Sequence, residues 1–305
     1  MGERVCAVIV TYNRKALLWE CLKAVLSQTR PPDHVLVVDN ASTDGTPEML
    51  QEEFPQVEVL RLPENQGGAG GFHEGMKRAY EQGFDWLWLM DDDALPSADC
   101  LEKLLKYALE MRLDGIAPLV IDAQDPNKLS FSVQQGFRRI LGVTELKEVE
   151  FIADFMNLFN GALLRSSVIN EVGLPRKELF VRGDEVDFLL RMRKSKLRFG
   201  TLTAAKLLHP SGLTEEFPLL GRRMVVVYTP NWGKNYYQYR NRVFLIREHK
   251  TGISKWLALS LEFIRHTLFF LLLRRSFKEW RRWLSAALDG YKGRLGCQPE
   301  PPQGR

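Results

Sequence analysis

The first 120 residues alternate short apolar runs with longer amphipathic stretches. The apolar runs have the length of buried strands and lie at residues 5–10, 35–38, 57–62, 86–90 and 115–120. Between them, the spacing of apolar residues predicts helices at 14–28, 46–54, 71–82 and 97–111. Strands that alternate with helices predict βαβ units and a mostly parallel, buried sheet, which is an α/β fold.

The rest of the chain divides into less regular and helical parts. Residues 121–150 show no clear period, a strand is expected at 159–164 and a helix at 185–196. Beyond about Asn241 the pattern is helical, and the last residues, from Gln298, predict a loose tail. We therefore expect three parts, at residues 1–120, 121–221 and 222–305.

Residues 256–273 form the most apolar stretch of the C-terminal part. Glu262, Arg265 and His266 interrupt it, and a spanning helix needs about 20 predominantly apolar residues. We therefore expect no membrane span here. Because several basic residues follow, an amphipathic segment at a membrane surface is expected, with a core helix of the protein as the alternative.

Composition fits a globular chain: of 305 residues, 45% are hydrophobic and 26% are charged. The N-terminus meets an acidic residue, Glu3, at once and has no apolar h-region, so no signal peptide is expected. The four cysteines lack the spacing of a metal site. These features predict a cytoplasmic protein without structural disulfides.

The net charge of +4 conceals an uneven distribution. Residues 222–294 hold 16 Lys and Arg against 4 Asp and Glu, a net charge of +12. The remainder holds 26 against 34, a net charge of −8. This asymmetry predicts a basic C-terminal module that faces a membrane, a nucleic acid or a phosphorylated lipid. A helical tail with a solvated basic face is the alternative.

Polar groups follow each of the first four predicted strands, at residues 11–14, 39–45, 65–71 and 91–93. In open α/β sheets, ligands bind outside the carboxyl ends of the strands. The sequence therefore predicts a ligand site at this edge of the sheet.

Three carboxylates, those of Asp91, Asp92 and Asp93, directly follow the run 86–90. They would repel one another unless a divalent cation neutralises them. In an extended chain Asp91 and Asp93 point the same way and Asp92 is turned aside. Asp91 and Asp93 are therefore candidate ligands for Mg²⁺ or Mn²⁺, with a solvated loop or a helix cap as the alternative.

The glycine run 67–71 precedes a predicted helix and would let a phosphate or sugar approach the backbone. It is not a Walker motif, and the first strand lacks the dinucleotide-binding fingerprint, so a Walker NTPase and a Rossmann dehydrogenase are disfavoured. Asp39 is a candidate to hold a ribose hydroxyl or a base, and an Asx turn is the alternative.

A second acidic cluster contains Asp184, Glu185 and Asp187 and precedes an apolar run. It either caps a helix or supplies a general base for attack by a hydroxyl group. His209 follows another β-like run. It is a candidate metal ligand only because the sequence already predicts a metal ion bound by carboxylate oxygens.

The segments 10–14 (Val-Thr-Tyr-Asn-Arg), 37–42 (Val-Val-Asp-Asn-Ala-Ser), 65–72 and 88–93 resemble the GT-A domain of family 2 inverting glycosyltransferases. A more specific resemblance, to one group within this family, comes from the segments 159–164, 179–187, 208–210 and 239–242. They are similar to bacterial galactofuranosyltransferases that begin galactan on a lipid-linked rhamnose acceptor, with rhamnosyltransferases as neighbours. The resemblance covers roughly residues 4–285.

This resemblance implies a GT-A fold, a Rossmann-like, mostly parallel sheet with flanking helices, followed by basic C-terminal helices. Residues 1–120 would bind the nucleotide sugar and residues 121–221 the acceptor. The implied metal ligands, for Mn²⁺ or Mg²⁺, are Asp91, Asp93 and His209. The uridine part of the donor would be held by Thr11, Arg14, Asp39 and Asn65, and its sugar or ribose would lie near Asp92 and Gly71. Glu185, next to Asp184, matches the position of the catalytic base, where most members have aspartate.

The implied activity is metal-dependent, inverting transfer of galactofuranose from UDP-galactofuranose to a rhamnosyl or other lipid-linked glycan in cell-envelope polysaccharide synthesis. The basic helices would hold the enzyme on the inner face of the membrane, and no nucleic-acid partner is expected. Rhamnosyl transfer from dTDP-rhamnose and a non-catalytic nucleotide-sugar-binding protein are the alternatives. A sugar nucleotidyltransferase is disfavoured, because the loop after the first strand lacks the glycine-rich sequence that it needs.

Overall fold

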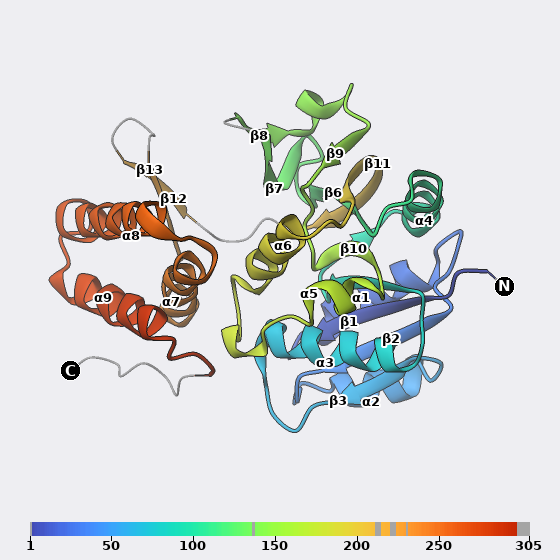
Figure 1. Cartoon of the computed structure of the whole chain (residues 1–305). Coiled ribbons are helices and arrows are strands. Elements are labelled where there is room, and N and C mark those ends of the chain that lie inside the picture. The colour runs from blue at the N-terminus through green and yellow to red at the C-terminus, as the bar shows by residue number, and fades with distance from the viewer. Residues whose placement is uncertain (1, 136–137, 211–214, 220–223, 230, 298–305) are drawn as a thin grey trace. The chain divides into compact units, whose positions relative to one another are not determined.

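The computed structural model describes residues 2–135, 138–210, 215–219, 224–229 and 231–297. The chain forms two compact units, one of residues 1–175 and 188–212 and the other of residues 176–187 and 213–305 (Figure 1). The loose tail expected from Gln298 onward lies outside the described residues.

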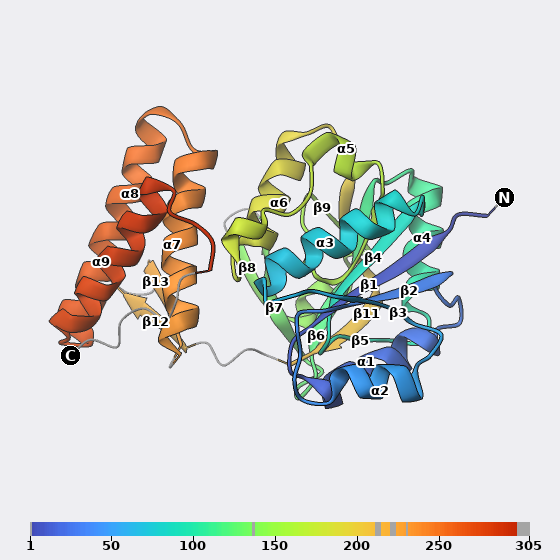
Figure 2. The same ribbon diagram turned by 90° about the horizontal axis from the view of Figure 1, so that it is seen from below.

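A mixed, mostly parallel sheet forms the centre of the first unit (Figure 2). Its main strands are β1 (Val5–Thr11), β2 (His34–Asp39), β3 (Glu58–Arg61), β4 (Trp86–Asp91), β5 (Leu95–Pro96), β6 (Gly115–Asp122), β10 (Asn160–Arg165) and β11 (Phe199–His209). They lie in the order β3-β2-β1-β4-β10-β6-β11-β5. The pairs β3-β2, β2-β1, β1-β4 and β6-β11 are parallel, whereas β10 is antiparallel to β4 and β6.

Helices cover both faces of this sheet. They are α1 (Lys15–Leu26), α2 (Thr46–Glu53), α3 (Gly67–Glu81), α4 (Cys100–Met111), α5 (Val168–Val172) and α6 (Asp184–Lys194). Apolar residues of α1, α2 and α4 pack on the face that holds Val5, Ala7 and Ile9 of β1. Those of α3, α5 and α6 pack on the opposite face. Every residue of β1 is buried, as the uninterrupted apolar run predicts for a central parallel strand.

Residues 121–150, which showed no clear period, carry an antiparallel pair, β7 (Lys128–Gln135) and β8 (Arg138–Gly142), and a short 3-10 helix, η1 (Val143–Leu146). A further short strand, β9 (Phe151–Ala153), pairs with β11. The five predicted strands and four predicted helices of the first 120 residues are all present. The largest difference is α3, which begins at Gly67 and therefore includes the glycine run that was expected to precede it.

The second unit is mainly helical, as expected. It contains a 3-10 turn, η2 (Lys177–Leu179), the antiparallel pair β12 (Glu215–Leu219) and β13 (Met224–Tyr228), and the helices α7 (Trp232–His249), α8 (Gly252–Thr267) and α9 (Phe277–Lys292), with a π-helical segment, η3 (Leu268–Leu273), after α8. Its core is rich in aromatic side chains, among them Tyr239, Phe269, Phe270 and Trp283. The strand pair was not expected, and α7 begins earlier than predicted.

The helical run Gly252–Leu273, which joins α8 and η3, has the length and mean hydropathy, 1.5, of a helix that crosses a membrane. By length and mean hydropathy this run is therefore a candidate membrane span, although the charged residues within it had led us to expect none. One such helix is weak evidence for a span. Within the unit, Glu262 and His266 are buried, whereas Ile253, Leu257 and Leu272 are largely exposed.

Candidate active site

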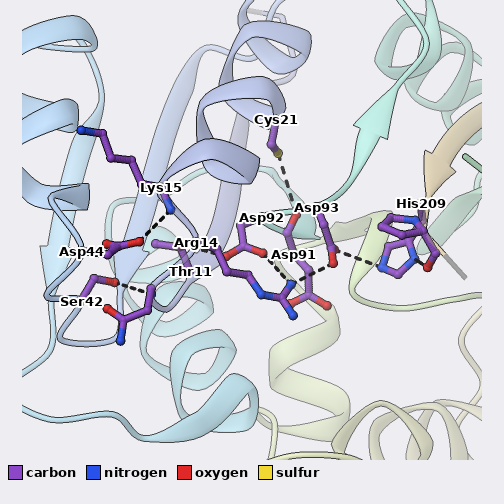
Figure 3. A network of polar contacts seen from close by, with 12 residues as sticks. Thr11, Arg14, Lys15, Cys21, Ser42, Asp44, Asp91, Asp92, Asp93 and His209 are labelled. Carbon is purple, nitrogen blue, oxygen red and sulfur yellow. Dashed lines mark hydrogen bonds and ion pairs between the residues drawn. The ribbon is translucent and has the colours of Figure 1, made fainter. Parts of the chain in front are cut away.

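The carboxyl ends of β1, β2 and β4 bring the first set of predicted site residues to one edge of the sheet. The parallel register pairs Thr11 with Asp39 and Val10 with Asp91. The loops that follow these strands are joined by hydrogen bonds, and Figure 3 shows their side chains close together. For example, the Thr43 backbone N–H donates to the Asn13 side chain at 2.7 Å.

Arg14 links the acidic residues that follow β4. Its Nη1 donates to Asp92 Oδ1 at 3.1 Å and to Asp93 Oδ2 at 2.8 Å. Thr11 Oγ1 donates to Asp92 Oδ2 at 2.7 Å. The guanidinium group therefore neutralises part of the repulsion between two adjacent carboxylates.

The alternation argument for the acidic triplet does not hold past Asp91. The chain turns directly after β4, and the Ala94 N–H donates to the Asp91 carbonyl at 3.2 Å. As a result, Asp92 contacts Thr11 whereas Asp93 contacts His209, and Arg14 reaches both.

His209, at the end of β11, lies next to Asp93. Its Nε2 is 3.1 Å from Asp93 Oδ1, and its Nδ1 is 2.7 Å from the Pro210 carbonyl oxygen. A carbonyl only accepts hydrogen bonds, so Nδ1 carries a proton, and in the neutral ring the Nε2 lone pair is directed at the carboxylate. Asp93 Oδ1 is buried and makes no hydrogen bond of good geometry.

These surroundings shift the pKa values of the carboxyls in opposite directions. Burial raises the pKa of Asp92 to about 6, although Arg14 and Thr11 favour its charged form. Burial also acts to raise the pKa of Asp93, but the contacts with His209 and Arg14 outweigh it and hold that pKa below its ordinary value. Asp93 is thus held as a carboxylate.

The donor set fits a divalent cation in part. Among the described residues, no group of three or more His, Cys, Asp and Glu side chains is arranged to hold a metal ion. The pair Asp93 and His209 nevertheless offers one carboxylate oxygen and one imidazole nitrogen 3.1 Å apart, and both are ligand types that suit Mn²⁺. Asp91, the third predicted ligand, is half-buried at the end of β4.

Asp39 is buried at the end of β2, beside a pocket of about 380 Å³ lined by α2, β3 and the segment between them. Its Oδ1 accepts from the Ser42 N–H at 2.9 Å, which is the Asx turn considered above. Its Oδ2 is buried without a hydrogen bond, and the nearest cation, Arg61 Nε, is 3.7 Å away. The local turn therefore uses only one of its two oxygens, and the second is available to a ligand.

Asn40 and Gly71 connect the glycine run to the sheet. Asn40 accepts from the Gln66 N–H at 3.2 Å and donates to the Gly67 carbonyl at 3.1 Å. A Cβ at Gly71 would come within 2.4 Å of Val10 Cγ1, so close packing of α3 on β1 is enough to require glycine there. Asn65 forms the turn into α3 by accepting from the Gly67 N–H at 2.8 Å.

The second acidic cluster opens α6, and residues 184–187 belong to the second unit. Asp184 is buried, whereas Glu185 is exposed and its Oε2 accepts from the Gly183 N–H at 3.0 Å. Asp187 is buried and contacts His249 at 2.8 Å and Arg176 at 3.3 Å. Of these three acids, Glu185 is the one whose carboxylate meets solvent.

Asn160 lies in the segment 159–164, where the sequence predicted a strand but no functional residue. It opens β10, pairs with Met90 of β4 and therefore lies next to Asp91. Its Oδ1 is buried without a hydrogen bond. A polar residue at the start of an otherwise apolar strand was the available signal.

Comparison with known proteins identifies the family. The model of glycosyl transferase family 2 matches residues 6–173, more than half of the chain. Over 300 residues the chain is 39% identical to galactofuranosyltransferase GlfT1 of Mycolicibacterium smegmatis, covering 96% of this chain and 98% of that protein. It is 22% identical to dTDP-rhamnosyl transferase RfbF of Shigella flexneri, covering 97% and 98%.

Solved structures confirm the fold. S. aureus TarS 1–349 in complex with UDP-GlcNAc is similar with a TM-score of 0.59 and 17% identity, over 95% of this chain and 82% of that one. GalNAc-T7 with UDP, GalNAc and Mn²⁺ is similar with a TM-score of 0.57 and 14% identity, over 80% of this chain and 48% of that one. The fold is therefore GT-A-like, with C-terminal helices. The chain belongs to glycosyl transferase family 2, is a glycosyltransferase, and is similar to galactofuranosyltransferases over nearly its whole length.

Proposed function

We propose that this glycosyltransferase moves galactofuranose from UDP-galactofuranose to a lipid-linked rhamnosyl or other glycan acceptor in cell-envelope polysaccharide synthesis. The observation that carries the proposal is the half-buried Asp93–His209 pair at the strand ends, in a chain with full-length similarity to a galactofuranosyltransferase. A nucleotide-sugar donor needs anchors for its base, ribose and diphosphate, and these strand ends supply polar groups for each.

Asp39 is the proposed anchor of the uridine. Its buried Oδ2 makes no hydrogen bond, which costs free energy until a ligand supplies a hydrogen-bond donor. Thr11, Arg14 and Asn65 would complete the nucleoside site, and Asp92 and Gly71 would lie near the ribose or the sugar. Arg14 is half-exposed while it binds Asp92 and Asp93, so its guanidinium can also meet a phosphate.

Asp91, Asp93 and His209 would hold the metal ion. When bound, Mn²⁺ or Mg²⁺ would neutralise charge on the departing diphosphate. The Nδ1–H bond of His209 to the Pro210 carbonyl fixes the ring with Nε2 toward Asp93, as outer-shell carbonyls do for metal-binding histidines.

Glu185 is the proposed general base, with Asp184 as its neighbour. Its carboxylate takes the proton of an acceptor hydroxyl while the hydroxyl oxygen bonds to the anomeric carbon. The bond from that carbon to the diphosphate oxygen breaks, and its electron pair leaves with UDP. Attack opposite the leaving group inverts the anomeric centre, so no covalent enzyme intermediate is needed.

Membrane attachment of the second unit is part of the proposal. On α8 and η3 the ionisable Glu262 and His266 are buried, whereas apolar side chains face outward: Ile253, Trp256, Leu257, Leu261, Ile264, Leu272 and Leu273. Basic residues follow directly at positions 274, 275, 278, 281 and 282. An apolar outer face beside a basic cluster suits the surface of an anionic bilayer, which supports the proposed location on the inner face of the cell membrane.

Rhamnosyl transfer from dTDP-rhamnose is the second candidate, and the full-length similarity to a dTDP-rhamnosyl transferase favours it. The test is a transfer assay with each donor on a synthetic rhamnosyl glycolipid. We expect UDP-galactofuranose to be used, and we expect Glu185→Gln to lower the rate of transfer about 10²–10⁴-fold, the usual contribution of a general base, while UDP binding is retained. Glu178→Gln, the same change on an exposed residue of the same segment, is the matched control. Turnover with dTDP-rhamnose alone would overturn the donor assignment, and an active Glu185→Gln variant would overturn the base.

A further inference from the structure

Two adjacent polar side chains of α7, those of Arg240 and Asn241, are buried inside the aromatic core of the second unit. Arg240 and Asn241 are 0% and 1% exposed, respectively. Burying a guanidinium or an amide group is unfavourable unless its hydrogen bonds are made. The hydrogen-bond partners of these two side chains therefore show which part of the chain they stabilise.

Asn241 binds the backbone of the segment that leads to the second acidic cluster. Its Nδ2 donates to three carbonyl oxygens, those of Leu179 at 2.9 Å, Val181 at 3.1 Å and Arg182 at 2.6 Å. Its Oδ1 accepts from Arg240 Nε at 2.8 Å, which fixes the orientation of the amide.

Arg240 holds the start of the same segment. Its Nη2 donates to the Leu179 carbonyl at 2.9 Å and to the Glu178 carbonyl at 3.3 Å. Its Nη1 donates to the Gly296 carbonyl at 2.6 Å. Together the two side chains bond four of the five carbonyls between residues 178 and 182.

This segment has a backbone that needs external support. Phe180 and Arg182 have φ values of 65° and 63°, and Gly183 has 92°. Non-glycine residues with such positive φ values are strained, and they persist only where the surroundings hold them. The strained residues end next to Asp184 and Glu185, and the Glu185 carboxylate is itself bound to the Gly183 N–H.

We infer that Asn241 and Arg240 are positioning residues for the catalytic acid: they hold the strained segment 178–182 in the conformation that presents Glu185. The inference rests on the proposed role of Glu185 as the base. It gives α7 a part in the chemistry beyond that of a core helix, although neither side chain touches substrate.

The experiment compares two isosteric substitutions on the same helix. Asn241→Asp replaces the donating amide by a carboxylate that faces three carbonyl oxygens. Asn235→Asp is the matched control, because Asn235 is also fully buried but bonds the Thr229 backbone, at 2.7 and 3.0 Å, and not the acid segment. For both variants, kcat and KM for UDP-galactofuranose on a rhamnosyl glycolipid, UDP affinity and thermal unfolding are measured.

We expect Asn241→Asp to lower kcat about 100-fold, the loss typical of a displaced reacting group, with KM and UDP affinity changed less than about threefold. Asn235→Asp should lower the unfolding temperature but keep kcat within about threefold of wild type. Wild-type kcat in Asn241→Asp, or an equal loss in both variants, would overturn the inference. If Asn241→Asp does not fold, the same measurements are made on Asn241→Ala, for which we expect kcat to fall about tenfold.

A double variant separates this inference from the proposed function. If Asn241 acts through Glu185, the losses do not multiply, and Glu185→Gln combined with Asn241→Ala stays within about threefold of Glu185→Gln alone. Multiplied losses would refute the positioning role and leave the base assignment intact. A Glu185→Gln variant that keeps wild-type turnover would instead refute the base assignment.

Discussion

Asp92 and Asp93 share one guanidinium group, and this contact illustrates what the residue types could and could not predict. Three adjacent aspartates after a buried strand predict a need for positive charge. They do not show that Arg14 supplies part of it, because that depends on a turn after Asp91 that brings both acids to the same cation. The pairing of Asp93 with His209 was equally invisible, since 116 positions of sequence separate them.

Asp93→Asn tests the acid–imidazole pair. The amide keeps the shape but weakens the ligand, and changing even an outer-shell partner typically lowers metal affinity 10–100-fold. We expect the Mn²⁺ concentration for half-maximal transfer to rise at least about 100-fold. Asp99→Asn, which alters an exposed acid paired with Lys103 on α4, should leave Mn²⁺ dependence unchanged. Unaltered Mn²⁺ dependence of Asp93→Asn would show that the residue is not a ligand.

Elements were predicted well where apolar period alone decides them. The strands β1, β2, β4 and β6 are buried along nearly their whole length, so their apolar runs are almost uninterrupted and easy to recognise. The edge strand β3 instead alternates half-buried and exposed residues. The pair β12 and β13 was missed, because Glu215, Glu216 and Pro218 break the alternation that predicts a strand. The start of α3 was missed because glycine has low helix propensity, whereas packing against β1 at Gly71 requires it.

Gly290→Ala tests the packing of α9 on α7. A Cβ at Gly290 would lie 2.0 Å from the Arg240 carbonyl oxygen, which is backbone and cannot swing away. We expect a loss of about 1–3 kcal/mol in unfolding free energy despite the better helix propensity of alanine. Gly68→Ala in α3, where a Cβ meets nothing within 4 Å, should be neutral or stabilising. Denaturant unfolding measures the free energy of unfolding of both variants. A Gly290→Ala variant as stable as wild type would contradict the close contact.

His266 predicts a pH dependence of the helical unit. Burial lowers its pKa from 6.5 to about 4, while Glu262, which faces it, is neutralised by Arg242 and Arg265. Tyr239 and Trp283 pack on its ring. Between pH 6.5 and 4 the unfolded chain binds more protons, so stability falls as pH falls, by about 2–3 kcal/mol from pH 7 to 4.5.

Denaturant unfolding of wild type and His266→Phe across this range checks the prediction. The phenylalanine keeps the ring packing but does not titrate, so the stability of the variant should fall by about 2–3 kcal/mol less than that of wild type. Parallel pH profiles of the two proteins would show that His266 is not held neutral.

At the scale of the whole molecule, the sequence predicted the α/β class, the mostly parallel sheet and the basic helical extension. It could not predict that residues 176–187 fold with the C-terminal helices, because that grouping depends on hydrogen bonds from Arg240 and Asn241. The division at residues 120 and 221 stays a prediction. The sequence also could not predict which face of α8 packs inward, which the buried Glu262 and His266 now show.

The outward apolar face of α8 predicts binding to anionic membranes. We expect the protein to sediment with phosphatidylglycerol vesicles at low salt and to be released as salt screens its basic residues. Trp256→Ser combined with Leu257→Ser should weaken this binding, whereas Leu109→Ser, an exposed apolar residue on α4, should not. Protein that stays in the supernatant at low salt would contradict membrane attachment.

The most direct test of the central claim, that the strand ends of the first unit bind a uridine diphosphate sugar with a divalent cation, is thermal unfolding with UDP, dTDP and GDP. Each nucleotide is added with Mn²⁺ and with EDTA. We predict stabilisation by UDP that requires Mn²⁺, about 2.7 kcal/mol at 100 times the dissociation constant. A preference for dTDP would favour rhamnosyl transfer, and no stabilisation by any nucleotide would contradict the account.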